Sequence, residues 1–145
     1  MAHRYCYRKL NTITIDDRFP LPNIEDILAR IGQAKVFSAL DLASGFHQIP
    51  VHPEDQCKTA FSTHEGHFEF TWMPFGLKNA PATFQRAMNS TLSELIGTTV
   101  FVYLDDIVIF SIDDESHVRH LESVFQVLMN HGLKIQLDKS EFMKN

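Results

Sequence analysis

Two adjacent carboxylates interrupt an apolar run in the last third of the chain. The run reads Val-Phe-Val-Tyr-Leu-Asp-Asp-Ile-Val-Ile-Phe over positions 100–110, and its carboxylates are Asp105 and Asp106. β-Branched and aromatic residues on both sides predict two buried strands that meet at or near a tight turn. A carboxylate beside such a core must be solvated, paired, neutralised or bound to a metal ion, because an isolated charge in apolar surroundings is costly.

A third acid makes metal binding the more plausible state of these carboxylates. Asp-Asp at a hairpin tip is ordinary turn chemistry when taken alone, but the segment 36–41 is a second short strand that ends in Asp41. Local salt bridges are scarce, since Arg86 is the only Lys or Arg between Lys78 and Arg119. Three acids at strand ends can converge on one edge of a sheet. Hard oxygen ligands with open coordination positions suit a pair of Mg²⁺ ions.

The pattern along the rest of the chain predicts an α+β domain of two layers, with helices packed on one face of an antiparallel sheet. Apolar residues at helical spacing predict helices over 22–31, 79–95 and 114–131. Asn79 is positioned to cap the second helix and Pro81 to occupy its first turn. Strands are expected at 36–41, 46–51, 57–63, 67–72 and 133–138, and in a central hairpin at 99–112.

The two longer helices are each expected to bury one face. The inward residues of the first are Phe84, Met88, Leu92 and Leu95, and those of the second are Val118, Leu121, Phe125 and Leu128. Gln85 and Arg86 are interpreted as ordinary helix residues. His117 and His120 are expected on the outer side of the second helix, and no cysteine pair supports a zinc site there or at His64 and His67.

Composition is that of one folded domain. The 145 residues are 44% hydrophobic and include 12 Phe, which favours a packed core over disorder. No apolar stretch is long enough to cross a membrane, and the N-terminus lacks the apolar core of a signal peptide. Cys6 and Cys57 provide no disulfide framework and indicate a reducing compartment. The net charge of −5 argues mildly against a nucleic-acid-binding surface, although acids gathered at one site leave basic residues elsewhere to contact phosphates.

Three segments follow one another in an order that is characteristic of a known family. They read FSALDLASGFHQI at 37–49, MPFGLKNAPATFQ at 73–85 and VYLDDIVIFS at 102–111, with YRKLN before them and LKIQLDKSEF after them. Together they resemble the palm motifs of a reverse transcriptase, most closely the polymerase of gypsy-type LTR retrotransposons. The resemblance implies a palm with partial fingers over residues 1–145. It also implies a larger Pol polyprotein whose thumb, connection and RNase H regions are absent from this chain.

The resemblance implies RNA-directed DNA polymerase activity, in which two metal ions assist transfer of dNTPs to a primer 3′-hydroxyl on an RNA or DNA template. It assigns Asp41 and Asp105 as the principal metal ligands, with Asp106 beside them and the backbone carbonyl of Leu42 on the triphosphate-bound ion. The ions are expected to be Mg²⁺, for which Mn²⁺ can substitute. Successive strand residues point to opposite faces, so Asp105 ranks above Asp106 as a direct ligand. Crowding of the acids predicts perturbed, coupled pKa values without metal.

A second set of residues is implied to surround the incoming dNTP. Ser44 and Gly45 match the stretch that contacts the triphosphate, although the residues alone describe a simple turn between strands. Phe46 matches an aromatic residue under the sugar, whose ring would clash with a ribose 2′-hydroxyl; without the resemblance it is a core aromatic. Phe75 and Gly76 flank the nucleotide, and Phe75 stands where retroviral relatives often carry Gln.

Contacts with template and primer are implied for three further residues. Arg8 and Pro81 match positions near the template. Tyr103 matches a position near the primer end, although a plain strand tyrosine explains it nearly as well. The register before YRKLN departs from the family pattern, so Arg4 is not assigned the role of the fingers arginine that holds the triphosphate.

Two other functions stay open at the level of the sequence. The same carboxylates would serve a two-metal nuclease or phosphatase, although hydrolysis has no need for the sugar-excluding ring of Phe46. Alternatively, the chain is a catalytically silent fragment that only folds or binds nucleic acid. The expected partners are a template with its primer, dNTPs and the rest of the Pol polyprotein, with no membrane. An intracellular location, cytoplasmic or in virus-like particles, is implied by the resemblance, and the sequence indicates no oligomeric state.

Overall fold

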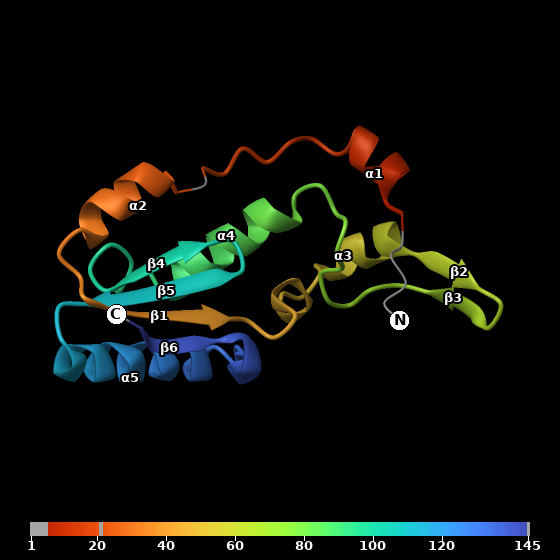
Figure 1. Ribbon diagram of the computed structural model, residues 1–145. Coiled ribbons are helices and arrows are strands. Elements are labelled where there is room, and N and C mark those ends of the chain that lie inside the picture. The colour runs from red at the N-terminus through yellow and green to blue at the C-terminus, as the bar shows by residue number, and fades with distance from the viewer. Residues whose placement is uncertain (1–5, 21, 145) are drawn as a thin grey trace.

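The computed structural model describes residues 6–20 and 22–144, and a four-stranded antiparallel sheet lies at its centre (Figure 1). Its strands are β1 (Val36–Asp41), β4 (Val100–Tyr103), β5 (Asp106–Ser111) and β6 (Glu141–Lys144), in the spatial order β4-β5-β1-β6. β4 and β5 form the predicted central hairpin. β1 pairs with β5 so that Val36 lies opposite Ser111 and Asp41 opposite Asp106. This register brings the acidic ends of two sequence-distant strands to the same end of the sheet.

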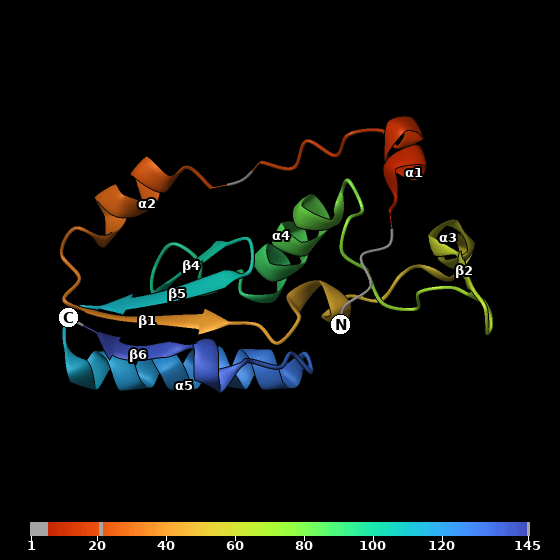
Figure 2. The same cartoon turned by 45° about the vertical axis from the view of Figure 1, so that its right-hand side comes forward.

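Helices α4 (Ala80–Thr91) and α5 (Asp114–Asn130) pack on this sheet, as predicted. Leu40 lies opposite Ile107, which in turn lies opposite Val102, so the three side chains share one face. They form a single buried cluster with residues of both helices, among them Phe84, Met88, Val124 and Leu128. Figures 1 and 2 show α5 running along β1 and β6. The two-layer α+β architecture follows because each helix and the sheet bury an apolar face against each other.

A smaller unit extends beyond the end of the sheet, at the place where the resemblance led us to expect partial fingers (Figure 2). It contains α3 (Pro53–Gln56), the 3-10 helix η2 (Cys57–Thr59) and a hairpin of β2 (Phe61–Thr63) and β3 (Gly66–Phe68). The predicted hairpin is confirmed, but its strands are shorter than 57–63 and 67–72. Residues 57–59 form a helical turn that continues from α3, which begins at Pro53 and is capped by His52. The second strand ends before Phe70, whose N–H donates to Thr59 Oγ1 rather than to the opposite strand.

The segment before the sheet follows an extended path past the β4 side of the molecule (Figures 1 and 2). It carries α1 (Arg8–Ile13), which was not predicted, and α2 (Ile24–Ile31), which confirms the helix expected over 22–31. α2 begins after Asn23, whose side chain accepts a hydrogen bond from Glu25 N–H. Within the ranges that the structure describes, no helix is both long enough and apolar enough to cross a membrane.

Two predicted strands are wrong because tight turns take their place. Over 46–51 the chain forms the 3-10 helix η1 (Gly45–Gln48), after Ser44 in a left-handed conformation with φ 52°, and Pro50 forms a single bridge with Trp72. Over 133–138, Ile135 forms a single bridge with Leu42, and the 3-10 helix η3 (Leu137–Lys139) follows. The edge of the sheet is completed by β6 instead.

A buried histidine corrects the expected orientation of α5. His117 is fully buried whereas Val118 is 47% exposed, so the outward placement of the first and the inward placement of the second are both wrong. The two ring nitrogens of His117 lie 2.7 Å from Ser38 Oγ and 2.7 Å from Ser111 Oγ. Burial lowers the pKa of His117, and the neighbouring His120 lowers it further. Serines on the sheet give this histidine polar partners inside the core, which helical periodicity does not reveal.

Candidate active site

Three carboxylates meet at the end of the sheet where β1 stops and β5 begins. Asp41 is the last residue of β1 and Asp106 the first of β5, and they are direct antiparallel partners. Side chains of such partners leave the same face of the sheet with their β-carbons about 5 Å apart. Asp105 lies in the two-residue turn between Tyr103 and Asp106, close enough to interact electrostatically with both other acids. The predicted convergence of the three acids is confirmed.

Asp105 lies in surroundings that disfavour its charge. Its Oδ1 atom is buried and has no hydrogen-bond partner among the described residues. Burial raises the pKa of Asp105, and the negative charges of Asp106 and Asp41 raise it further. None of the ion pairs formed in the described part of the chain involves any of these acids. The predicted pKa perturbation is therefore confirmed at Asp105.

The carboxylates do not by themselves complete a metal cage. Among residues 6–20 and 22–144, no group of three or more His, Cys, Asp or Glu side chains is arranged to hold a metal ion. Mg²⁺ is usually held by one or two carboxylates, and water and substrate phosphates complete its coordination. An oxygen-only donor set with one buried oxygen lacking a partner fits a hard divalent cation that shares its coordination with a phosphate.

A buried glutamine holds the turn that carries Asp105. Gln85, on α4, is fully buried; its Oε1 accepts a hydrogen bond from Leu104 N–H at 2.8 Å, and its Nε2 donates to the Val102 carbonyl at 3.0 Å. Leu104 has φ 52°, a left-handed conformation that residues other than glycine rarely adopt. The glutamine therefore supports a strained turn next to the acid. Its interpretation as an ordinary helix residue is wrong, and its spacing of three residues before the inward Met88 was the available signal.

Main-chain contacts hold Asp41 from the other side. Gln136 N–H donates to the Asp41 carbonyl at 2.8 Å, and Asp41 N–H donates to Ser140 Oγ at 3.2 Å. The adjacent Leu42 is 2% exposed and forms its bridge with Ile135. The segment after α5 thus anchors the first acid. Sequence reasoning missed these partners because Ser140 lies 99 residues from Asp41 along the chain.

The turn that follows Asp41 packs directly against the carboxylate site. Ser44 is exposed, whereas Gly45 is buried at the start of η1. A β-carbon on Gly45 would lie 2.9 Å from the Phe84 ring and 3.4 Å from Asp105 Oδ1. Only glycine therefore allows the chain to approach Asp105 this closely without displacing its neighbours.

Gly45→Ala is expected to lower the free energy of unfolding by about 1–3 kcal/mol, because the added methyl group must displace the Phe84 ring. Gly32→Ala is the matched control, since Gly32 ends α2 in a right-handed helical conformation and a β-carbon there meets nothing closer than 3.5 Å. The control is expected to retain full stability. Urea unfolding followed by circular dichroism measures both variants. Equal stabilities would contradict the close approach at Gly45.

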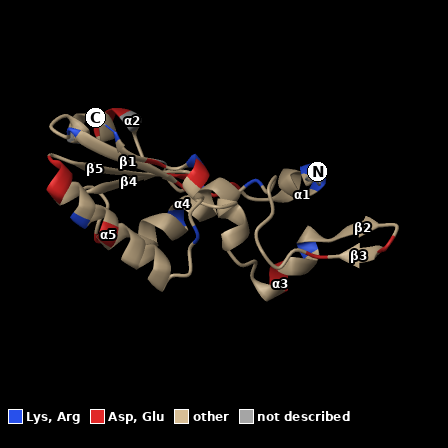
Figure 3. Cartoon of the chain, turned by 60° about the horizontal axis from the view of Figure 1, so that its bottom comes forward, with Lys and Arg blue, Asp and Glu red and all other residues tan. Residues whose placement is uncertain are grey.

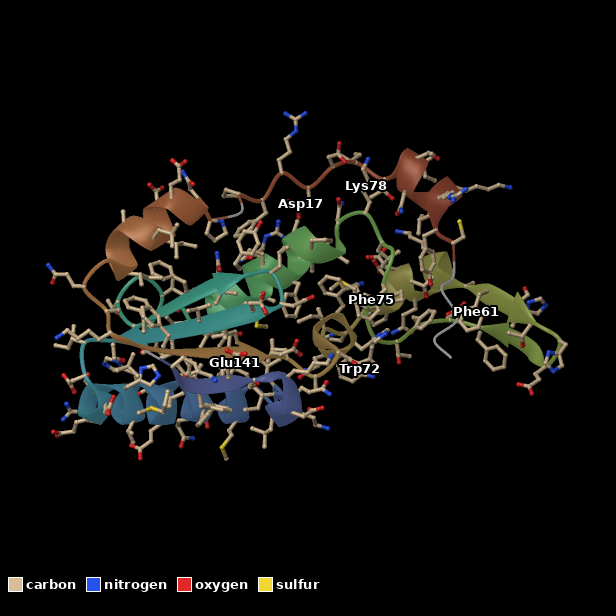
Figure 4. All side chains as sticks on the ribbon, viewed as in Figure 1. Asp17, Phe61, Trp72, Phe75, Lys78 and Glu141 are labelled. Carbon is tan, nitrogen blue, oxygen red and sulfur yellow. The ribbon has the colours of Figure 1, made fainter. Side chains whose placement is uncertain are left out.

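Aromatic rings form a wall beside this turn. The Phe46 ring lies 5.4 Å from that of Phe84 and 5.2 Å from that of Phe75, measured between centroids. Phe75 also contacts His47 at 5.0 Å and is 51% exposed, so half of its surface stays available to a ligand. Figure 4 shows Phe75 between the sheet and the partial fingers. Gly76 follows it with φ 95°, a conformation that favours glycine.

The residues implied to contact template and primer lie on separate elements. Tyr103 is half-buried and lies opposite Asp106, beside the carboxylates. Pro81 occupies the first turn of α4, as predicted, whereas Arg8 is exposed on α1, on the fingers side and away from the acids (Figures 1 and 2). Arg4 lies outside the described residues. Figure 3 shows Lys and Arg at scattered positions on several elements.

Comparisons with known proteins give this arrangement a family context. A family model described as reverse transcriptase (RNA-dependent DNA polymerase) matches residues 2–145. The Retrovirus-related Pol polyprotein from transposon 297 of Drosophila melanogaster is 54% identical over 138 residues, which cover 95% of this chain and 13% of that protein. The polyprotein from transposon gypsy of the same organism is 46% identical over 138 residues, again 95% of this chain and 13% of that protein. An RNA-directed DNA polymerase homolog of Oenothera berteroana is 44% identical over 129 residues, 86% of this chain and 91% of that protein.

The fold is shared with a solved polymerase structure. The foamy viral protease-reverse transcriptase in complex with an RNA/DNA hybrid matches with a TM-score of 0.86 and 29% sequence identity. The match covers 96% of this chain and 19% of that chain. The present chain thus spans only a small part of the length of the transposon and viral proteins that it resembles.

Proposed function

Because the chain belongs to the reverse transcriptase (RNA-dependent DNA polymerase) family, we propose that residues 1–145 form the palm and partial fingers of an RNA-directed DNA polymerase. The proposed reaction is attack of a primer 3′-hydroxyl on the α-phosphate of a dNTP, directed by an RNA or DNA template. The observation that carries the proposal is the pairing of Asp41 with Asp106 beside the buried Oδ1 of Asp105, which has no hydrogen-bond partner in the described chain.

The carboxylates of Asp41 and Asp105, with Asp106 beside them and the Leu42 carbonyl, are proposed to hold two Mg²⁺ ions, for which Mn²⁺ can substitute. When bound, the ions lower the pKa of the primer hydroxyl and stabilise the leaving pyrophosphate. The protein contributes a set of oxygens fixed in advance, through the β1–β5 ladder and the hydrogen bonds of Gln85 to the turn. Fixed ligands need little reorganisation during the reaction, which favours the transition state.

The dNTP is proposed to lie along two segments, Ser44–Phe46 and Phe75–Gly76. Backbone N–H groups in a turn such as that at Ser44 and Gly45 are suited to phosphate oxygens. The Phe46 ring is braced by Phe84 on one side and Phe75 on the other, so it cannot easily move away from a bound sugar. This bracing supports a role for Phe46 in excluding a ribose 2′-hydroxyl.

Phe46→Ala is expected to admit ribonucleotides, because removal of the ring leaves space for the 2′-hydroxyl. The ratio of kcat/KM for dTTP to that for UTP is expected to fall by at least about tenfold, comparable to the loss of a packing contact in a specificity pocket. Single-nucleotide extension with each triphosphate measures the ratio. Phe101→Ala, which removes a ring stacked on Phe110 elsewhere in the sheet, is the control for general loosening. Unchanged sugar discrimination in Phe46→Ala would remove Phe46 from this role.

The proposed partners are a primed RNA or DNA template, dNTPs and further regions of a Pol polyprotein, namely thumb, connection and RNase H. Arg8 and Pro81 are proposed to contact the template and Tyr103 the primer end; the position of Tyr103 opposite Asp106 supports the last assignment. We propose that the chain acts inside the cell, in the cytoplasm or in virus-like particles.

Primer extension on a poly-rA template, with an oligo-dT primer, dTTP and Mg²⁺, tests the proposed function. The chain is expected to add nucleotides to the primer. Release of nucleotides from the primer ends would instead support the two-metal nuclease, and absence of both reactions would support the silent fragment. The wall of Phe46 and Phe75 favours polymerisation, because hydrolysis requires no ring beneath a sugar.

A further inference from the structure

The segment over residues 11–19, which we call the strap, comprises the last three residues of α1 and the irregular chain that follows them. It is tied to the chain around the start of α4 by side-chain amides. Asn11 Nδ2 donates to the Gly76 carbonyl at 2.8 Å, and Asn11 Oδ1 accepts from Lys78 N–H at 2.9 Å. One amide group thus bridges both ends of the turn over 76–78. The turn includes Gly76 in its left-handed conformation, with φ 95°.

A second amide makes the reciprocal connection. Asn79 Nδ2 donates to the Ile15 carbonyl at 2.8 Å, and Asn79 Oδ1 accepts from Asp17 N–H at 3.1 Å. Asn79 was predicted to cap α4, but its side chain makes no capping hydrogen bond and serves the strap instead. Asn11 and Asn79 are therefore chemically equivalent anchors, each with two hydrogen bonds to remote backbone, but only Asn11 reaches Gly76.

Polar contacts rather than apolar burial hold the strap. Ile13 is 80% exposed and Ile15 88% exposed. A cavity of about 680 Å³ is lined by strap residues, by residues of α3 and η2, and by the turn before α4. Lys78 Nζ lies 2.7 Å from Asp16 Oδ1, and Arg86 pairs with Asp17 (Figure 4 labels Asp17 and Lys78). Lys78 Nζ also donates to the Thr14 carbonyl at 3.1 Å, and Arg86 lies over the Phe19 ring. Ion pairs near the surface contribute little, and of these contacts only the Asn11 amide bonds the backbone at both ends of the 76–78 turn.

We propose that Asn11 is a positioning residue that fixes the backbone conformation at Gly76. Through Gly76 it fixes the position of the adjacent Phe75 ring at the proposed dNTP site. This inference rests on the proposed function, because it assigns Asn11 to the affinity for the incoming nucleotide. A two-point hydrogen bond from a side-chain amide restrains both the carbonyl direction at Gly76 and the N–H direction at Lys78. Without it, the left-handed Gly76 is free to exchange between backbone conformations, and Phe75 moves with it.

The test compares Asn11→Leu with Asn79→Leu in the full chain. Each variant loses two hydrogen bonds between a side-chain amide and remote backbone, so their general effects on stability are matched. Titration calorimetry with dTTP, Mg²⁺ and poly-rA carrying a primer that ends in a 3′-dideoxynucleotide measures nucleotide affinity, because this primer cannot be extended. Hydrogen exchange at the Lys78 amide measures the turn directly and needs no nucleotide.

Asn11→Leu is expected to weaken dTTP binding about tenfold and to accelerate exchange at Lys78 about tenfold, whereas Asn79→Leu is expected to change both by less than about twofold. Asn11→Asp provides a second variant should Asn11→Leu fail to fold. It keeps the acceptor for Lys78 N–H but turns a carboxylate oxygen toward the Gly76 carbonyl. It is therefore expected to retain slow exchange at Lys78 and still to weaken dTTP binding.

The outcomes separate the inference from its premise. Equal effects of the two Leu variants on dTTP affinity would overturn the positioning role and reduce Asn11 to a strap anchor. Unchanged exchange at Lys78 in Asn11→Leu would overturn it as well. If the unmodified chain binds no dTTP, the proposed function fails first, and the nucleotide role of Asn11 fails with it even where exchange at Lys78 responds.

Discussion

Asp105→Asn is expected to reduce primer extension by at least about 1000-fold, which corresponds to about 4 kcal/mol of transition-state stabilisation. The substitution keeps the size of the side chain but replaces an anionic oxygen with a neutral amide, and Mg²⁺ binds amide oxygen far more weakly than carboxylate. The buried Oδ1 of Asp105, beside the paired Asp41 and Asp106, would lose the charge that a cation requires. Single-turnover primer extension measures the effect.

The same substitution is expected to stabilise the fold at neutral pH. Burial and the two neighbouring acids raise the pKa of Asp105 above its usual 3.8, so the folded chain binds a proton at this site more tightly than the unfolded chain does. The free energy of unfolding therefore decreases as pH rises through the window that begins near 3.8 and ends at the higher folded pKa. Asp105→Asn removes this loss because the amide does not ionise.

Glu122→Gln is the control for both measurements, since Glu122 is exposed in the middle of α5 and its substitution removes the same charge. It is expected to leave extension and stability close to those of the unmodified chain. Urea unfolding at pH 4 and pH 7 measures the free energy of unfolding of each variant. A loss of stability in Asp105→Asn at pH 7, or extension within tenfold of the unmodified chain, would contradict the description of Asp105 as a strained ligand held ready for a cation.

Gln85→Leu is expected to lower the free energy of unfolding by about 2–3 kcal/mol and primer extension by about 100-fold. Leucine fills most of the volume but leaves the Leu104 N–H and the Val102 carbonyl without their partner, and an unsatisfied buried polar group costs about 1–3 kcal/mol. The left-handed turn then relaxes and Asp105 shifts. A misplacement of about 1 Å in an active site costs about 100-fold in rate.

Gln126→Leu is the matched control for this prediction. Gln126 lies on α5 and donates to Asn130 one helical turn later, as Gln85 does to Asn89, but it is exposed to solvent. Its replacement is expected to change stability by less than about 0.5 kcal/mol and extension not at all. If both variants behaved alike, or if Gln85→Leu lost stability but extended primers normally, Gln85 would be a core residue without influence on the acidic turn.

Local patterns in the sequence predicted the acidic hairpin and the main helices. β-Branched residues on both sides of Asp105 and Asp106 predicted β4 and β5, and apolar spacing predicted α2, α4 and α5. The same patterns failed over 46–51 and 133–138, where short apolar runs form 3-10 turns and single bridges. Runs of this length carry too few residues to distinguish a strand from a turn that is shaped by distant contacts.

By itself, the sequence determined the order of the motifs, the α+β class and the three acids, because these depend on residue types and on spacings of a few positions. Only the tertiary structure decided which polar side chains form hydrogen bonds that hold the acids and the strap in place. Gln85 bonds the acidic turn and Ser140 bonds Asp41. Asn11 bonds the backbone of the 76–78 turn, and Asn79 bonds the backbone of the strap. A hydrogen bond between residues 62 or 99 positions apart depends on where the chain returns to itself, and it leaves no periodic pattern in the sequence.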